Sequence, residues 1–272
     1  MFSICSVMYN VIKMDFAWQE SIQNWVNFLD ENGEIVIVVN KSEDDSLGAI
    51  TREADKIKIN SLVKFKIIPA EISYEDALFD GILKNIAYKN ASMDFVIALD
   101  ADERLLISSK KYWVQAAFDL SQKQEDALFV PVVNLFKNED CYSDIAFKFY
   151  LVKNKPYIHR GVVNYAKKEN GKIDITKSDS TEWLLENDNL IRASYILNPA
   201  LPDFLKIRSL DSNPFVYHLG YKDLEYRKKI NFFWKPVWES RAGHEVNDIK
   251  LTDEDFSKVP YFQHNLPHWN SK

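Results

Sequence analysis

Apolar residues in the first hundred positions follow a regular pattern that predicts four strands separated by three helices. Short apolar runs that suit buried strands lie at 2–9, 34–39, 63–68 and 95–99. Apolar residues spaced by three and four predict helices over 11–30, 47–54 and 73–89. Strands and helices that alternate in this way predict an α/β fold with a mostly parallel central sheet and helices on both faces.

The pattern changes after residue 105, where strands follow one another with few helices between them. A helix is expected around 112–120, followed by strands at 127–136, 145–152 and 157–165. These strands predict a smaller antiparallel lobe. The polar stretch 166–192 is typical of a long loop, and a basic, aromatic and helical stretch is expected at 223–241.

Composition narrows the class of protein. Of the 272 residues 46% are hydrophobic and 14% aromatic, which predicts a well-packed fold and excludes a disordered chain. The net charge of −6 gives no general attraction to nucleic acid. The two cysteines are too few for a disulfide framework, which favours a cytoplasmic protein. No apolar run is long enough to span a membrane, although peripheral contact with the inner membrane face stays open.

Two acidic residues directly follow the apolar run 95–99. Asp100 and Asp102 are two positions apart, so in a continuing strand both side chains would point to the same face. Ligands of α/β sheets gather at the carboxyl ends of the strands, and paired carboxylates there suit Mg²⁺ or Mn²⁺ with a diphosphate. The alternative is that these acids only cap the strand and begin the next element.

Three blocks of sequence together resemble the family-two glycosyltransferases of the GT-A fold. The blocks are Ser3–Asn10, the acidic run that ends in Asp-Ala-Asp-Glu at 100–103, and His-Leu-Gly-Tyr at 218–221. The resemblance implies residues 1–105 as a nucleotide-sugar-binding half and 106–222 as an acceptor-binding half. Residues 223–272 would be a C-terminal extension packed on the same domain.

The resemblance also implies roles for single residues. Asp100 and Asp102 would hold Mn²⁺ or Mg²⁺, with Asp102 the direct ligand and His218 a third one. Lys84 would neutralise phosphate. The residues expected to contact the nucleotide are Tyr9, Asn10, Asn40, Lys84 and Asp100.

Some of these residues also have plain structural interpretations. The alternative for Lys84 is an ordinary solvated lysine of a helix, and the alternative for Tyr9 is a packing residue. Many members of the family carry an acid where Asn40 stands. The sequence therefore does not identify the nucleotide base of the donor, although a UDP-sugar is favoured. His159, His244, His264 and His268 have no comparable context and are left unassigned.

An inverting transfer needs a carboxylate that takes the proton of the acceptor hydroxyl. Asp140 and Asp144 are the candidates, in a loop expected after an acceptor-half strand, with Glu139 and Glu182 as further acids. None of these acids lies in a motif that selects it. If no such base exists, a reaction that retains the configuration of the sugar is favoured over one that inverts it.

The function expected from the sequence is metal-assisted transfer of a sugar from a nucleotide donor to a hydroxyl of a glycan, polysaccharide or lipid-linked acceptor. One alternative is a nucleotidyltransferase that makes sugar nucleotides, although the glycine-rich loop typical of that class is absent from 8–11. The other is an inactive relative that binds sugars or a partner through aromatic residues such as those at 232–238.

Overall fold

The computed structural model describes most of the 272-residue chain. The described residues are 1–15, 17–29, 31, 33–73, 79–156, 158–161, 183–186, 189–221, 261–271 and six further positions between 225 and 259. Of residues 158–161, 183–186, 189–190, 220 and 221 the backbone is described and the surroundings of the side chain are not.

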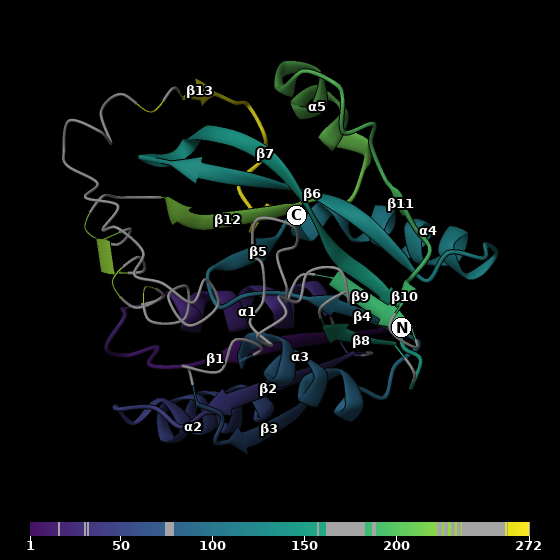
Figure 1. Cartoon of the computed structure of the whole chain (residues 1–272). Helices are drawn as coiled ribbons and strands as arrows, with labels where there is room; N and C mark the ends of the chain where they lie inside the picture. The colour runs from purple at the N-terminus through teal and green to yellow at the C-terminus, as the bar shows by residue number, and fades with distance from the viewer. Residues whose placement is uncertain are drawn as a thin grey trace, which may run out of the picture.

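One large mixed sheet runs through the molecule in the order β3-β2-β1-β4-β7-β6-β12-β5, with β11 beside β6 and β13 beside β7 (Figure 1). Its strands are β1 (Phe2–Met8), β2 (Glu34–Asn40), β3 (Lys64–Ala70), β4 (Phe95–Ala98), β5 (Glu103–Leu105), β6 (Ala127–Phe136), β7 (Asn138–Lys153), β11 (Ala193–Tyr195), β12 (Val216–Tyr221) and β13 (Phe262–Gln263). A small second sheet contains β8 (Ile158–Gly161), β9 (Trp183–Glu186) and β10 (Asn189–Leu190).

The parallel half of the sheet agrees with the α/β fold class predicted from the sequence. Strands β3, β2, β1 and β4 are mutually parallel. From β7 onward the directions are mixed, because β7 is antiparallel to both β4 and β6, whereas β12 and β11 are parallel to β6. Of the strands expected to form a separate antiparallel lobe, β6 and β7 therefore continue the central sheet, whereas β8 belongs to the small second sheet. The three-part division of the chain by function stays a prediction.

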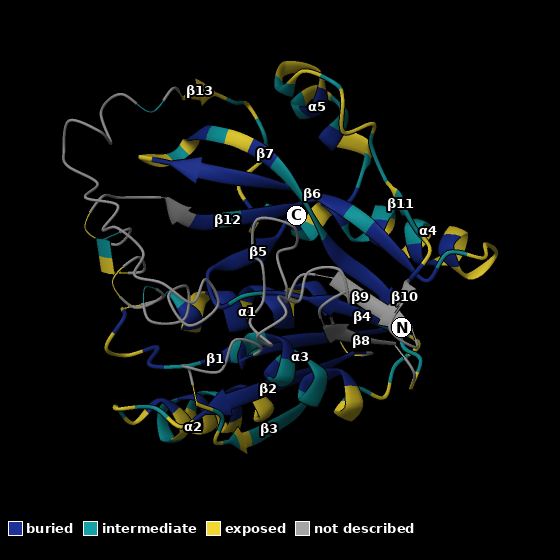
Figure 2. Cartoon of the chain, viewed as in Figure 1, coloured by how far each residue is buried: buried dark blue, intermediate teal, exposed yellow. Residues whose placement is uncertain are grey.

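Helices cover both faces of the sheet, as expected. They are α1 (Trp18–Leu29), α2 (Ser46–Lys58), α3 (Phe79–Asn90), α4 (Lys110–Ser121) and α5 (Asp203–Ser209), with 3₁₀ turns at Ile107–Ser109 and Leu210–Ser212. Apolar side chains of α1, α2 and α4 form one buried cluster with the sheet, and those of α3 form another on the opposite face. Figure 2 shows β1, β2 and β4 as almost continuously buried, whereas the edge strand β3 is intermediate or exposed.

The first helix begins later than its apolar pattern predicts. Residues 11–15 form a turn, and α1 starts at Trp18. Asn10 and Asp15 have φ angles of 48° and 56°, a left-handed conformation that no α-helix contains. Asn10 Oδ1 accepts a hydrogen bond from the Glu43 amide (2.7 Å), so the turn is tied to the loop after β2. This tertiary contact overrides the local helical pattern.

Further boundaries also differ from those predicted. β4 ends at Ala98, so Asp100 and Asp102 lie in a turn that the Glu103 amide closes by donating to the Asp100 carbonyl (3.1 Å). Strand alternation therefore does not orient these two acids. Asp140 and Asp144 lie within the long strand β7 and not in a loop.

Several predicted segments fall partly or wholly outside the described residues. The loop expected over 166–192 contains β9 and β10 where it is described, and most of the strand expected over 157–165 lies outside the description. The same holds for most of the helical stretch 223–241. Among the helices that the structure describes, none has the length and apolar character needed to cross a membrane.

Candidate functional site

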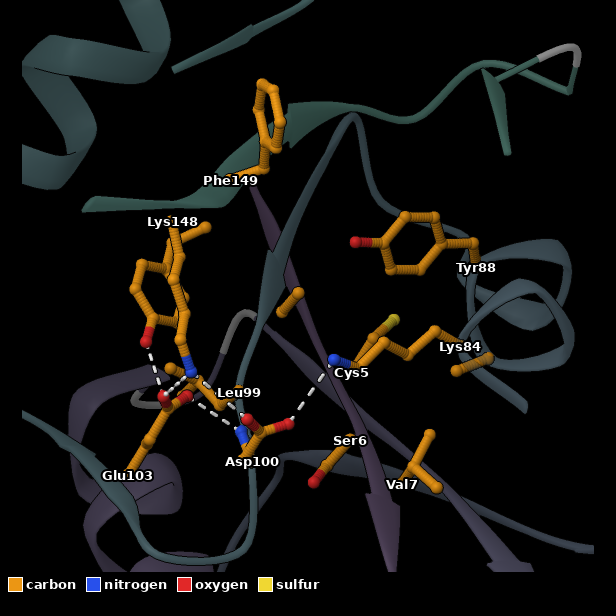
Figure 3. A pocket seen from close by; sticks show the side chains of 13 residues that line it. Cys5, Ser6, Val7, Lys84, Tyr88, Leu99, Asp100, Glu103, Lys148 and Phe149 are labelled. Carbon is orange, nitrogen blue, oxygen red and sulfur yellow. Dashed lines mark hydrogen bonds and ion pairs between the residues drawn. The ribbon is translucent and has the colours of Figure 1, made fainter. Parts of the chain in front are cut away.

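A pocket lies where β1 and β4 end, between α3 and β7 (Figure 3). Its wall includes charged residues from three parts of the chain and a serine of β1; these are Ser6, Lys84, Asp100, Glu103 and Lys148. The Ser6 hydroxyl is buried and makes no hydrogen bond within the described part of the chain. A buried polar atom of this kind in a pocket wall is one that a bound ligand or water can satisfy.

Asp100 lies between two lysines that come from different halves of the chain. Lys84 Nζ, from α3, is 3.6 Å from Asp100 Oδ1, and Lys148 Nζ, from β7, is 3.5 Å from Asp100 Oδ2. Figure 3 shows the two ammonium groups on opposite sides of the Asp100 carboxylate. The Lys84 side chain is only 14% exposed, so it is not the solvated helical lysine of the alternative interpretation.

Glu103 is a buried carboxylate that contacts both Asp100 and Lys148. It is fully buried, and its Oε2 accepts a hydrogen bond from the Asp100 amide (2.8 Å). Its Oε1 accepts from Lys148 Nζ (3.1 Å) and from the Tyr150 hydroxyl. Burial raises the pKa of Glu103. Burial and the nearby Glu103 raise the pKa of Tyr150 well above its usual value, so the phenol stays protonated and donates.

Asp102 faces His218 of β12. Asp102 Oδ2 lies 3.4 Å from His218 Nε2, and the Leu219 amide donates to the Asp102 carbonyl (3.0 Å). Burial raises the pKa of Asp102, but the charge and hydrogen bond of His218 reverse this and hold it below its usual value. Burial lowers the pKa of His218, and Asp102 more than compensates, so this pKa is raised.

The other ring nitrogen of His218 is also engaged. His218 Nδ1 lies 2.7 Å from Asn134 Oδ1, and Asn134 Nδ2 donates to Asp144 Oδ2 (2.8 Å). Ser143 Oγ donates to the second oxygen of Asp144 (2.8 Å). A continuous chain of polar contacts thus leads from Asp102 through His218 to Asp144.

The Asp102–His218 pair fits a divalent cation. Two cis ligand atoms about 2.1 Å from an octahedral ion such as Mg²⁺ are about 3.0 Å apart, so the observed 3.4 Å would need to shorten by a few tenths of an ångström. No group of three or more His, Cys, Asp or Glu side chains suited to a metal occurs among the described residues. An ion held here therefore needs further ligands from its substrate or from water.

Three of the residues predicted to bind the nucleotide, Tyr9, Asn10 and Asn40, already make contacts within the protein. Asn10 and Asn40 are both 2% exposed, and their side-chain amides hydrogen-bond to neighbouring loops. Tyr9 is partly buried, and its ring packs edge-on against Phe79, with ring centroids 6.0 Å apart. All three lie at the carboxyl ends of β1 and β2. Their contacts to a base or ribose stay predictions.

The two predicted base candidates lie in different surroundings. Asp144 belongs to the polar chain that leads to His218. Asp140 lies beside the C-terminal segment, where the His264 amide donates to the Asp140 carbonyl (2.9 Å). Of the two candidates, Asp144 is the one that is linked to a predicted metal ligand, since Asn134 hydrogen-bonds to both Asp144 and His218.

Sequence reasoning missed the parts of the site played by Lys148, Glu103 and Asn134. Glu103 directly follows Asp102, and the motif alone does not distinguish its role from those of the two aspartates. Lys148 and Asn134 are single polar residues within apolar strands, at 145–152 and 127–136. A polar residue inside an apolar strand indicates a candidate site, because a buried polar group requires a hydrogen-bonding or charged partner.

No protein-family model and no curated protein sequence matches the chain. Among solved structures, S. aureus TarS 1–349 aligns over 88% of this chain and 80% of its own, at 14% identity and a TM-score of 0.41. The same protein in complex with UDP-GlcNAc aligns over 93% and 77%, at 15% identity and a TM-score of 0.41. The mannosyltransferase PcManGT from Pyrobaculum calidifontis, in complex with GDP-Man and Mn²⁺, aligns over 47% and 34%, at 18% identity and a TM-score of 0.35. Identities and TM-scores this low support no conclusion about what this chain binds.

Proposed function

We propose that the protein is a glycosyltransferase that moves a sugar from a nucleoside-diphosphate donor to a hydroxyl group of a glycan or lipid-linked acceptor. The observation that carries this proposal is the pair Asp102–His218 beside an aspartate that two lysines flank, at the carboxyl ends of parallel strands. The order of the sequence blocks that contain these residues supports the same function.

The charges of the site suit a metal–diphosphate complex. Three carboxylates, of Asp100, Asp102 and Glu103, face two ammonium groups and one imidazole. The site is therefore not strongly positive by itself and would bind a bare diphosphate weakly. With a divalent cation held by Asp102 and His218, the balance would become positive and would favour the departing nucleoside diphosphate, which gains one negative charge when the sugar leaves.

Each charged residue has a separate task in this proposal. Mg²⁺ or Mn²⁺, when bound, absorbs negative charge that develops on the leaving diphosphate. Lys84 and Lys148 bind phosphate oxygens from two sides as point charges, and Glu103 fixes the position of Lys148. Inversion is the stereochemical course that we assign, and it requires an acceptor-half carboxylate as base.

Calorimetry with nucleotides tests the proposal. The wild-type protein should bind one of UDP, GDP or dTDP in the presence of Mn²⁺ and bind it much more weakly in EDTA, with UDP the expected ligand. The corresponding sugar nucleotide should then release its diphosphate when acceptor glycans are added. If folded protein binds none of the three diphosphates, the donor-site assignment is wrong. Release of pyrophosphate from a nucleoside triphosphate and a sugar phosphate would instead favour a nucleotidyltransferase.

Replacement of either lysine should weaken binding of the diphosphate specifically. For Lys84→Met and Lys148→Met we expect a roughly tenfold higher Kd for the nucleoside diphosphate, about 1.4 kcal/mol, because one cationic contact is lost. Binding of the nucleoside without phosphates should stay unchanged. Lys153→Met is the matched control, because Lys153 lies on β7 and its ammonium donates to the Lys123 carbonyl away from the pocket. Equal losses for nucleoside and diphosphate would contradict a phosphate contact.

A further inference from the structure

Four neighbouring strands place polar side chains in one row across the sheet. Asp144 of β7 is the register partner of Asn134 of β6, which is the partner of His218 of β12. His218 in turn pairs with Glu103 of β5, the residue that follows Asp102. The positions come from parts of the sequence far apart, and only the order of the strands brings them together.

The hydrogen bonds in this row have a defined direction. An ionised carboxylate only accepts hydrogen bonds, so the contact between Asn134 and Asp144 (2.8 Å) fixes the amide NH₂ toward Asp144. The amide oxygen of Asn134 is then directed at His218 Nδ1 (2.7 Å). Because a carbonyl oxygen accepts, Nδ1 must carry a hydrogen. The opposite amide orientation would place the Asn134 oxygen against the carboxylate and is disfavoured.

The direction of these bonds decides which nitrogen of the neutral imidazole carries the lone pair. With hydrogen on Nδ1, the lone pair lies on Nε2, the atom that faces Asp102 Oδ2 at 3.4 Å. Two electron-pair donors that face each other at this distance suit a cation between them. Histidines that bind metals commonly donate their second ring N–H to a carbonyl or carboxylate, which fixes the ring and its tautomer.

We propose that Asn134 and Asp144 are positioning residues that hold His218 in the tautomer whose Nε2 binds the divalent cation together with Asp102. The inference rests on the proposed function, since that function supplies the cation. It also changes the role of Asp144, which acts through Asn134 and not as the base that accepts the acceptor proton. Asn134 is 8% exposed and the His218 side chain 17%, so burial restricts other orientations of both groups.

Mn²⁺ affinity of the protein, measured by electron paramagnetic resonance of free Mn²⁺ with saturating nucleoside diphosphate, tests the positioning role of Asn134. Loss of an outer partner of a metal-binding histidine typically weakens metal binding by about 10- to 100-fold, and we expect this for Asn134→Ala. The matched control is Asn138→Ala, an exposed asparagine at the start of β7, which should bind Mn²⁺ like the wild type. Unfolding midpoints of all variants show whether the fold is kept.

Two substitutions of Asp144 separate positioning from proton transfer. Asp144→Asn keeps an oxygen that accepts the Asn134 hydrogen bond, so Mn²⁺ affinity and sugar transfer should stay within about threefold of the wild type, whereas Asp144→Ala should lose Mn²⁺ affinity. A base at this position gives the reverse result, in which Asp144→Asn abolishes transfer and both variants keep their Mn²⁺ affinity. That result would overturn the proposal.

Nitrogen-15 spectra of the Mg²⁺-loaded protein report the tautomer directly. His218 should show hydrogen on Nδ1 in the wild type, and a mixture of tautomers in Asn134→Ala. Hydrogen on Nε2 in the loaded wild type overturns the inference and also removes His218 as a metal ligand. An unchanged Mn²⁺ affinity in Asn134→Ala overturns the inference alone. In both cases nucleoside-diphosphate binding that depends on Mn²⁺ would still support the proposed function. A wild-type protein that binds no Mn²⁺ with any nucleoside diphosphate overturns both.

Discussion

We expect Asp102→Asn to lower the rate of the proposed sugar transfer by about a thousandfold, because the neutral amide would no longer hold the cation proposed to stabilise the leaving diphosphate. A metal ion contributes several kcal/mol of transition-state stabilisation, and about 4 kcal/mol corresponds to a factor of roughly a thousand. Steady-state kcat/KM with the sugar nucleotide that binds best is the measurement.

The matched control for Asp102→Asn is Asp94→Asn. Asp94 directly precedes β4, its side chain is 82% exposed, and it pairs with the N-terminal amine far from the site. This control should transfer sugar at the wild-type rate. Asp102→Asn with near-normal kcat/KM and the same dependence on Mn²⁺ would contradict the assignment of Asp102 as a metal ligand.

We expect Glu34→Ala to lower the free energy of unfolding by about 2–3 kcal/mol at neutral pH, because buried hydrogen-bond donors lose the charged oxygens that accept from them. Glu34 is fully buried at the end of the sheet opposite the site, where Lys66 Nζ lies 3.0 Å from Oε2. Ser92 Oγ donates to the same oxygen (2.9 Å), and Ser3 Oγ donates to the other. One carboxylate therefore ties together β1, β2, β3 and the segment before β4.

The contribution of Glu34 depends on pH in a defined direction. Burial raises the pKa of Glu34, but hydrogen bonds from Ser3 and Ser92 and the contact with Lys66 outweigh it, so the pKa is lowered in the folded protein. The stabilisation is complete above the unfolded value of about 4.3 and is lost as the pH falls through the lower folded value.

Urea denaturation of the wild type and of Glu34→Gln at pH 7 and pH 3 measures this dependence. The difference in unfolding free energy should be large at pH 7 and small at pH 3. Glu71→Gln is the control, because Glu71 is 73% exposed and should change stability by less than about 1 kcal/mol at either pH. A difference for Glu34→Gln that does not shrink at pH 3 would show that its carboxylate is not stabilised by charge.

The parallel half of the fold was predictable because its information is local. Each strand from β1 to β4 is a short apolar run, and each helix between them carries its own period, so order and type follow from neighbouring residues. The prediction was wrong where a distant contact overrides the local pattern. Residues 11–15 continue the apolar period of α1 but form a turn, because Asn10 is bonded to the loop after β2.

The candidate site divides in the same way. Asp100, Asp102 and His218 were singled out from motifs, and the structure places Asp102 beside His218. The Asp100 carboxylate lies between Lys84 and Lys148, and its contact with the metal stays a prediction. Lys148 could not be assigned from sequence, because its place beside Asp100 depends on the antiparallel pairing of β7 with β4.

The sequence by itself determined the α/β class, the parallel strands and the position of the acidic pair after β4, since these depend on residues close together along the chain. Only the tertiary structure decided the order β4-β7-β6-β12-β5, and with it the row Asp144, Asn134 and His218. Strand pairing between distant segments depends on side-chain packing across the whole sheet, and a shift of one residue turns every side chain to the opposite face. The partners of the buried polar groups therefore follow from that register.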